Sequence, residues 1–240
     1  MRKALLLLTL SAILFFFSCK SDREKKAEPT TYKVEEKTAS ATTSVPDKSG
    51  FTPYLMFVAE QPIPSFDLWL PVFNAHDADR KASGLTVLRI GRSIEDSNTV
   101  LIRMKADDLD KAKEFAKAMK EDLKNAGRTV EPRFSYFNVL RDDSSYTDIN
   151  ERALVSYHVK DFDAWLKVYD EKGKATREKH GLVDRGLGRG IEDPNTVYIL
   201  FAVSDMRKAR ARLASSELRK ILRNAGVDGK MTVSYYKVVQ

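Results

Sequence analysis

The residues best suited to acid–base chemistry in this chain are its three histidines, His76, His158 and His180. A histidine changes its charge near neutral pH and can therefore act as a general base. Only His158 lies in a stretch that alternates like a β-strand, directly after Tyr157. Tyr157 and His158 are therefore the candidates for catalysis, and His158 is also a candidate for ligand binding. The alternative is that His158 is a half-buried strand residue without a chemical role.

Two arginines recur at matching places and are candidates for binding an anionic ligand. Arg92 is followed three residues later by Glu95, and Arg189 is followed in the same way by Glu192. The alternative is that each arginine pairs with the nearby acid and braces a turn, with a modest effect on stability.

Several other chemistries lack their sequence patterns. No carboxylate or second histidine stands at metal-ligand spacing beside any of the three histidines, so we expect no metal and no cofactor. There is no G-x-S-x-G motif, no P-loop and no dinucleotide-binding fingerprint. The formal net charge is +7, and most of the excess lies in residues 151–240. We nevertheless expect no nucleic acid partner, because the N-terminus predicts export.

The only cysteine, Cys19, ends a secretory pattern. Two basic residues precede the apolar run 4–17, and Ser18 follows it. This run is shorter than the roughly 20 residues of a membrane-spanning helix. The pattern resembles the lipobox of bacterial lipoproteins, although Phe16 and Phe17 replace the preferred leucine and small residue. The resemblance implies that residues 1–18 are a signal peptide and that Cys19 is diacylated. The alternative is an ordinary cleaved signal peptide.

Residues 19–50 are predicted to form a lipidated, disordered tether. They are rich in Lys, Glu, Thr, Ser and Ala, a composition that cannot bury enough apolar area to fold. Such a chain has a root-mean-square reach of roughly 30 Å, and its acyl chains would hold it on a membrane. Lys20 follows the cysteine in place of an aspartate, which favours the outer membrane, facing either the periplasm or the surface.

The remainder of the chain is a duplication. Residues 66–70 (FDLWL) match residues 162–166 (FDAWL), and residues 91–100 (GRSIEDSNTV) match residues 188–197 (GRGIEDPNTV). Further matches follow in the same order: Asn125-Ala126-Gly127 with Asn224-Ala225-Gly226, and Ser135-Tyr136 with Ser234-Tyr235. We refer to residues 51–140 as copy 1, residues 153–240 as copy 2 and residues 141–152 as the linker.

Each copy predicts the order strand, helix, strand, strand, helix, strand. The first helix is expected to begin at Ser65 in copy 1 and Asp161 in copy 2, and to end at a glycine. The terminal glycines are Gly84 and Gly181, and the second helices are expected to be capped by Asp107 and Ser204. Strands are expected at 133–140, 153–159, 182–189, 196–203 and 231–239. This order is the ferredoxin-like arrangement. The fold class is therefore α+β, with two tandem βαββαβ domains.

Copy 2 resembles antibiotic biosynthesis monooxygenase-like domains of the dimeric α/β-barrel superfamily. The resemblance is carried by residues 157–165, 192–197, 214–218 and 224–227. It implies that the two copies pair as an intramolecular dimeric α/β barrel. Haem-degrading members of this family use a tryptophan and a histidine, whose positions fall here at Ala202 or Val203 and at Arg212, so the resemblance does not imply haem chemistry.

Further features of the sequence concern the core, the first strand of copy 1 and the place of a site. Trp69 and Trp165 recur at helical spacing with other aromatic residues and are expected in the core. Pro62 and Pro64 are expected to shorten the first strand of copy 1, since proline lacks a ladder donor. Any active cavity is expected in copy 2, because only copy 2 carries a strand histidine, His158 beside Tyr157, and only copy 2 clearly resembles the oxygenase-like domains. The second helix of copy 2 is basic, which is typical of a solvated face or of a contact with anionic headgroups.

Three functions remain open from the sequence. The first is a lipid-anchored envelope protein whose two domains bind a small molecule or a protein partner. The second is a cofactor-independent monooxygenase that acts on a small aromatic substrate. The third is a structural envelope lipoprotein. A cavity lined by Tyr, His or Arg groups would favour the first two functions over the third.

Overall fold

The computed structural model describes residues 51–125, 127–128, 130–143, 145, 148–171 and 173–240. Cys19, the signal peptide and the tether therefore lie outside the described residues. The secondary structure follows the chain as β1 (Tyr54–Pro62), α1 (Phe66–Ala75), α2 (Asp77–Ala82), β2 (Leu85–Ser93), β3 (Thr99–Ala106), α3 (Leu109–Asn125), β4 (Arg133–Asp142), β5 (Glu151–His158), α4 (Phe162–Glu171), α5 (Lys174–Lys179), β6 (Leu182–Gly190), β7 (Thr196–Val203), α6 (Met206–Ala214), α7 (Ser216–Asn224) and β8 (Thr232–Val238).

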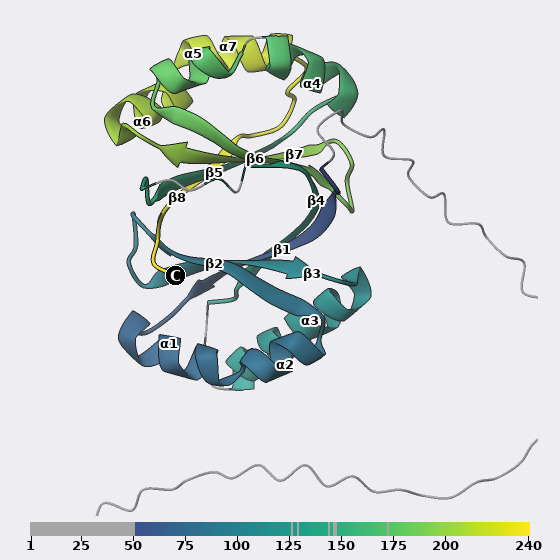
Figure 1. Ribbon diagram of the computed structural model, residues 1–240, viewed down its shortest axis with the longest axis vertical. Helices are drawn as coiled ribbons and strands as arrows, with labels where there is room; N and C mark the ends of the chain where they lie inside the picture. The colour runs from purple at the N-terminus through teal and green to yellow at the C-terminus, as the bar shows by residue number, and fades with distance from the viewer. Residues whose placement is uncertain (1–50, 126, 129, 144, 146–147, 172) are drawn as a thin grey trace, which may run out of the picture. The chain divides into compact units, whose positions relative to one another are not determined.

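The eight strands close into one antiparallel barrel in the order β1-β3-β2-β8-β5-β7-β6-β4. Each copy contributes a four-stranded ferredoxin-like sheet, β4-β1-β3-β2 or β8-β5-β7-β6. The sheets join at two seams, where β2 pairs with β8 and β4 pairs with β6. The helices of copy 1 cover one outer face and those of copy 2 cover the other (Figure 1). The predicted α+β fold and intramolecular barrel are confirmed.

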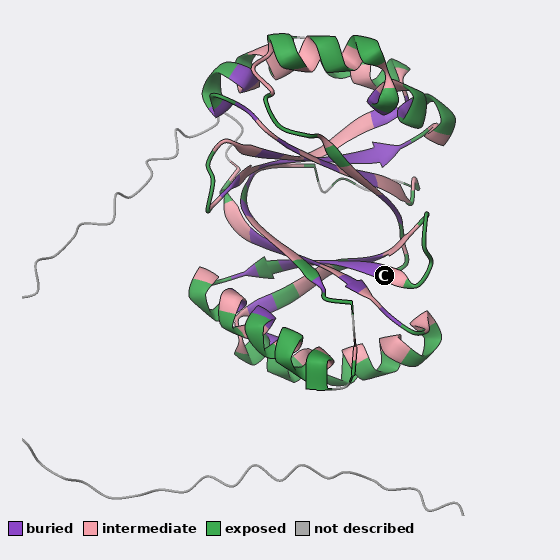
Figure 2. Cartoon of the chain, turned by 180° about the vertical axis from the view of Figure 1, so that it is seen from behind, coloured by how far each residue is buried: buried purple, intermediate pink, exposed green. Residues whose placement is uncertain are grey.

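Alternation along the strands places apolar side chains on both faces of each sheet. One cluster lies between the two sheets, inside the barrel, and includes Met56, Phe137 and Tyr236. A further apolar cluster lies between each sheet and the helices of the same copy. Figure 2 shows exposed residues gathered on the outer sides of the helices, whereas buried residues gather on the strands. Because both faces of the sheets are covered, the core has several layers.

Each seam brings a glycine of the repeated Gly-Arg motif against an aromatic ring. A Cβ atom on Gly91 would lie 2.2 Å from Cδ2 of Tyr236, and one on Gly188 would lie 2.4 Å from Cδ2 of Phe137. Neither distance is sterically possible for a real Cβ atom. The motif therefore requires glycine because the ring from the other copy packs directly on the backbone.

The two glutamates of the repeated motif form ion pairs across the copies. Glu95 of copy 1 accepts from Arg210 on α6 at 2.7 Å, and Glu192 of copy 2 accepts from Lys113 on α3 at 2.7 Å. These pairs are partly exposed, so each contributes little to stability. Their matching positions show that the copies are related by approximate two-fold symmetry.

Several sequence-based predictions of local structure need correction. The first helix of each copy is divided in two, at His76 in copy 1 and before α5 in copy 2. The second helices are capped one residue later than predicted, by Asp108 and Asp205, whose carboxylates accept from backbone N–H groups three residues on. The first strand of copy 1 is not shortened, because Pro62 is its last residue and leaves the ladder intact.

Other predicted boundaries agree with the structure. Asp161 accepts from the N–H of Ala164 at 2.9 Å, as a helix cap does. Gly84 and Gly181 follow their helices with positive φ angles of 70° and 74°. None of the described helices is long and apolar enough to span a membrane.

Candidate functional site

Copy 2 contains a cavity of about 180 Å³ between its sheet and its four helices. Strands β5 and β7 line one side with apolar side chains such as Val155 and Ile199, and helix α7 lines the other with residues such as Leu222. Tyr157 and Trp165 also face this space. Tyr157 is the sequence-predicted residue that lines this cavity.

Near the cavity, copy 2 has smaller or more polar side chains at positions where copy 1 has phenylalanines, and one of them, Arg212, lines it. In copy 1 the ring of Phe57 lies 6.5 Å from that of Phe115 and 5.5 Å from that of Phe134. The register of the sheets places Ala153 at the position of Phe57 and Val233 at that of Phe134. Alignment of the second helices, through their buried alanines 112 and 209, places Arg212 at the position of Phe115.

The hydroxyl and indole groups in the cavity are hydrogen-bond donors at neutral pH. Tyr157 is 5% exposed, and burial raises the pKa of its hydroxyl far above the usual value. It therefore stays protonated under physiological conditions. Its ring meets the ring of Trp165 edge to face, with centroids 5.9 Å apart, and this aromatic pair forms a rigid part of the lining.

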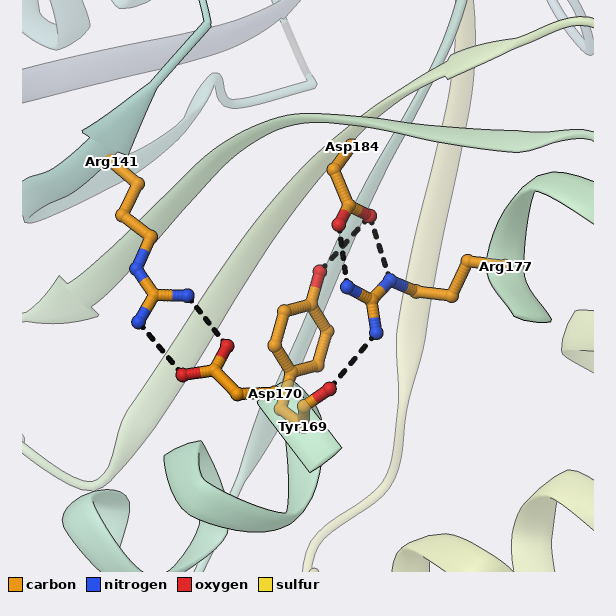
Figure 3. Close-up of polar contacts among 5 residues, drawn as sticks. All are labelled: Arg141, Tyr169, Asp170, Arg177 and Asp184. Carbon is orange, nitrogen blue, oxygen red and sulfur yellow. Dashed lines mark hydrogen bonds and ion pairs between the residues drawn. The ribbon is translucent and has the colours of Figure 1, made fainter. Parts of the chain in front are cut away.

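One end of the cavity is held by a network of Arg177, Asp184 and Tyr169 (Figure 3). The guanidinium of Arg177 donates twice to the carboxylate of Asp184, from Nε at 2.7 Å and from Nη2 at 2.5 Å. It also donates to the carbonyl oxygen of Tyr169 at 3.0 Å and lies over that ring at 3.8 Å. The Tyr169 hydroxyl donates to Asp184 at 3.2 Å. Burial, followed by the charge of Asp184, raises the pKa of Tyr169.

Copy 1 has part of the same network. Arg80 lies over the ring of Phe73 at 3.7 Å and donates to its carbonyl oxygen at 2.6 Å. However, Val87 takes the position of Asp184, and Nε of Arg80 is buried without a hydrogen-bond partner among the described residues. The arginine therefore braces the helix pair in both copies, and in copy 2 a carboxylate and a hydroxyl are also present. Sequence reasoning missed Arg80 and Arg177 because it treated each interrupted first helix as continuous.

A second ion pair in Figure 3 joins the copies near this end of the cavity. Arg141, at the end of β4, donates to both carboxylate oxygens of Asp170 on α4, at 2.6 and 2.9 Å. This bidentate geometry fixes the orientation of α4 relative to the strand from copy 1.

Arg212 is the cationic lining residue with the fewest protein contacts. Its side chain is 11% exposed and its Nη1 lies 3.1 Å from Glu217, which is itself largely exposed. By comparison, Arg177 is held by the carboxylate of Asp184 and a carbonyl oxygen. Arg212 is therefore the group best placed to meet an anionic or acceptor atom of a molecule in the cavity.

His158 lies elsewhere, at the end of β5 and on the opposite face from Tyr157. Its Nδ1 is 2.5 Å from Asp228 and its Nε2 is 3.3 Å from Asp193, and its side chain is 41% exposed. The hydrogen bond to Asp228 is the main cause that raises the pKa of the imidazole above its usual value. His158 does not line the cavity, so the structure does not bring it together with the Tyr157 hydroxyl.

Arg92 and Arg189 occupy equivalent places and brace the β-hairpins, but not through the neighbouring glutamates. Nε of Arg92 donates to the carbonyl oxygen of Ser97 at 3.1 Å, and Nε of Arg189 donates to that of Pro194 at 2.7 Å. Each guanidinium also lies over a phenylalanine ring at the start of the first helix of its copy. Their expected acidic partners instead pair across the copies, as described above.

The remaining histidines have no part in the cavity. His76 contacts Asp79 at 2.8 Å on the exposed surface of α2. Among the described residues, no group of three or more His, Cys, Asp or Glu side chains is arranged to hold a metal ion.

No protein-family model matches this chain, and no curated protein matches it. Similar folds are found among solved structures. An anthrone oxidase-like protein is 13% identical, with 78% of this chain and 92% of the other covered and a TM-score of 0.49. A heme-degrading enzyme from Listeria monocytogenes is 13% identical, with coverages of 76% and 99% and a TM-score of 0.42. A monooxygenase-like protein from Listeria innocua is 10% identical, with coverages of 78% and 96% and a TM-score of 0.43. At these identities the likeness concerns the fold alone.

Proposed function

We propose that this chain is a lipid-anchored envelope protein whose copy 2 binds a small, mainly apolar molecule that carries one anionic or acceptor group. The observation that carries the proposal is the copy 2 cavity with Arg212 in its lining. Arg212 stands where copy 1 has Phe115. The lipid anchor rests on the sequence around Cys19.

The size of the cavity supports a ligand of about one aromatic ring. Its volume of about 180 Å³ is close to that of an apolar protein cavity of roughly 150 Å³ that binds benzene. Its lining is mostly apolar, with polar groups supplied by residues such as Tyr157 and Arg212. This combination of an apolar space and a few polar groups is typical of small-molecule sites.

Fluorine NMR of para-fluorobenzoate tests the proposal. The wild type should broaden the signal of the probe, and an excess of unlabelled benzoate should restore it. Arg212→Gln should weaken binding about tenfold or more, because a hydrogen bond to a charged group contributes about 1.5–3 kcal/mol. Arg207→Gln is the matched control, since Arg207 is an exposed residue of the same helix, and it should bind like the wild type.

A second variant separates the cavity from the charge. Arg212→Phe introduces the side chain that copy 1 uses at this position, so it should fill the space and abolish binding of neutral para-fluorotoluene as well. The proposal fails if the wild type does not bind either probe, or if Arg212→Phe binds both as tightly as the wild type does.

Cofactor-independent oxygenation of a small aromatic substrate is a second candidate function. The aromatic pair of Tyr157 and Trp165 beside a ring-sized space favours it. The described polar groups of the lining are hydroxyl, indole and guanidinium donors, which favours binding as the first choice. Oxygen consumption with an aromatic compound that binds the cavity, lost in Arg212→Phe, would support the oxygenase.

A further inference from the structure

A second cavity, of about 440 Å³, lies at one end of the barrel and is lined by both copies. Four arginines line it, each from a different strand: Arg89 from β2, Arg103 from β3, Arg152 from β5 and Arg185 from β6. We call it the four-arginine site. It is separate from the cavity beneath the helices of copy 2.

The positive charges of the four-arginine site exceed the negative ones. Two carboxylates line it, those of Asp142 and Asp143. Asp143 lies 3.3 Å from Arg185, and Asp142 accepts a hydrogen bond from the Tyr54 hydroxyl at 2.9 Å. No described carboxylate lies within ion-pair distance of the other three arginines. Four cations against two anions leave a formal excess of two positive charges.

The strand register brings these like charges together. Arg89 and Arg103 are direct cross-strand partners in the β2–β3 ladder, and like charges in this relation are destabilising. Burial lowers the pKa of Arg152, and the charges of Arg185, Arg103 and Arg89 lower it further. Three of the four donate to nearby acceptors: Arg89 to the carbonyl oxygen of Leu88, Arg152 to those of Ile149 and Glu151, and Arg185 to Ser145. These neutral acceptors hold the guanidinium groups in place but do not cancel their charge.

A buried hydroxyl lies beside two of these arginines. Tyr236 is 1% exposed and is the cross-strand neighbour of Arg152. Burial raises the pKa of its hydroxyl, whereas the charges of Arg103 and Arg152 and a hydrogen bond with Arg103 act to lower it. Because the pKa is raised overall, the hydroxyl stays neutral and does not offset the charge of these guanidinium groups.

We propose that the four-arginine site binds a small multivalent oxyanion, a phosphate ester or a polycarboxylate. Guanidinium groups bind phosphate and carboxylate through paired, charge-assisted hydrogen bonds. The volume falls within the range of about 300–1,000 Å³ of small-molecule sites. Asn150 lines the cavity and supplies an amide. The anion would offset the repulsion among the arginines.

Calorimetric titration of the full-length protein in detergent tests this site. The probes are citrate and glycerol phosphate, each added at constant ionic strength against sodium chloride. The wild type should bind at least one of them, and Arg103→Gln and Arg152→Gln should each weaken binding about tenfold or more. Arg223→Gln changes the net charge equally at an exposed position on α7 and should leave affinity unchanged. The proposal is overturned if the wild type binds neither probe, or if Arg223→Gln weakens binding as much as Arg103→Gln does.

Thermal unfolding separates loss of the site from loss of the fold. Without a ligand, Arg103→Gln should unfold at the same temperature as the wild type or higher, because it removes one of the like charges. With citrate or glycerol phosphate, the wild type should gain more in unfolding temperature than this variant. Vesicles that contain phosphatidylglycerol distinguish a soluble anion from a lipid headgroup: binding to vesicles alone, with no effect of Arg103→Gln, would overturn the proposal.

Discussion

Replacing Gly188 with alanine tests whether the seam between the copies depends on close packing of a ring on the backbone. The new Cβ atom would lie 2.4 Å from Cδ2 and 2.9 Å from Cε2 of Phe137, and 3.2 Å from the carbonyl oxygen of Asn138. Either the ring must move or the β4–β6 ladder must separate. Overpacking of this kind costs about 1–3 kcal/mol.

Gly186 offers a matched control on the same strand. A Cβ atom there would lie no closer than 3.5 Å to any neighbouring atom, which is ordinary van der Waals contact. Replacing such a glycine with alanine stabilises a protein by about 0.4–1 kcal/mol, because it reduces the entropy of the unfolded chain. The two variants should therefore differ by about 1.5–4 kcal/mol in their free energies of unfolding.

Urea unfolding measured by circular dichroism gives these free energies. For a domain of this size each kcal/mol corresponds to a change in Tm of about 2–4 °C, which provides an independent measure. The dependence on urea should stay the same in both variants, since the folded state should bury the same surface. If Gly188→Ala is no less stable than Gly186→Ala, the ring does not restrict this position and the account of the seam is wrong.

Three further predictions concern the anchor, the pairing of the copies and the histidine at the end of β5. Cells labelled with a clickable fatty acid should show a labelled wild type and an unlabelled Cys19→Ala variant, and equal labelling would remove the anchor. Residues 151–240 expressed alone should self-associate or unfold in sedimentation experiments, because the edges of β6 and β8 would lose their partners; a stable monomer would show that pairing is unnecessary. The pKa of His158 is raised in the folded state, mainly by its hydrogen bond to Asp228. The stability that the protonated imidazole gives the fold should therefore be complete below the pKa of the unfolded chain, about 6.5. It should disappear as the pH rises through the pKa of the folded protein. The stability difference between wild type and His158→Gln should therefore decrease with rising pH, and a difference that stays constant across this range would contradict the assignment.

The fold could be predicted from the sequence because the evidence for it is local and appears twice. The strand at 153–159 alternates clearly, and its apolar face is the one that meets the helices. The recurrence of the same motifs in the same order showed that two similar domains share one chain. Interruptions in the helices were missed, because each first helix was expected to continue to its terminal glycine, Gly84 or Gly181, although its aromatic residues end before the break.

The candidate sites depend on contacts that sequence spacing does not reveal. The copies differ near the copy 2 cavity, with Ala153 in place of Phe57 and Arg212 in place of Phe115. These differences are visible once the copies are aligned, but their effect on volume needs the packing. The four-arginine site is even less accessible from sequence, because its residues come from four strands of two domains. The cross-copy pairs of Glu95 and Glu192 likewise require the barrel to close.

Covalent joining of the two sheets changes what a single substitution can do. In a barrel built from two identical chains, every substitution appears twice, once on each side of the symmetry axis. A new arginine in the barrel would then bring its own repeat, and a cavity opened in one half would also open in the other. Here Arg89 has Gly186 as its counterpart in copy 2, and Arg103 has Leu200. The tandem chain can thus assemble an asymmetric binding surface one residue at a time while its seams keep the symmetry of a dimer.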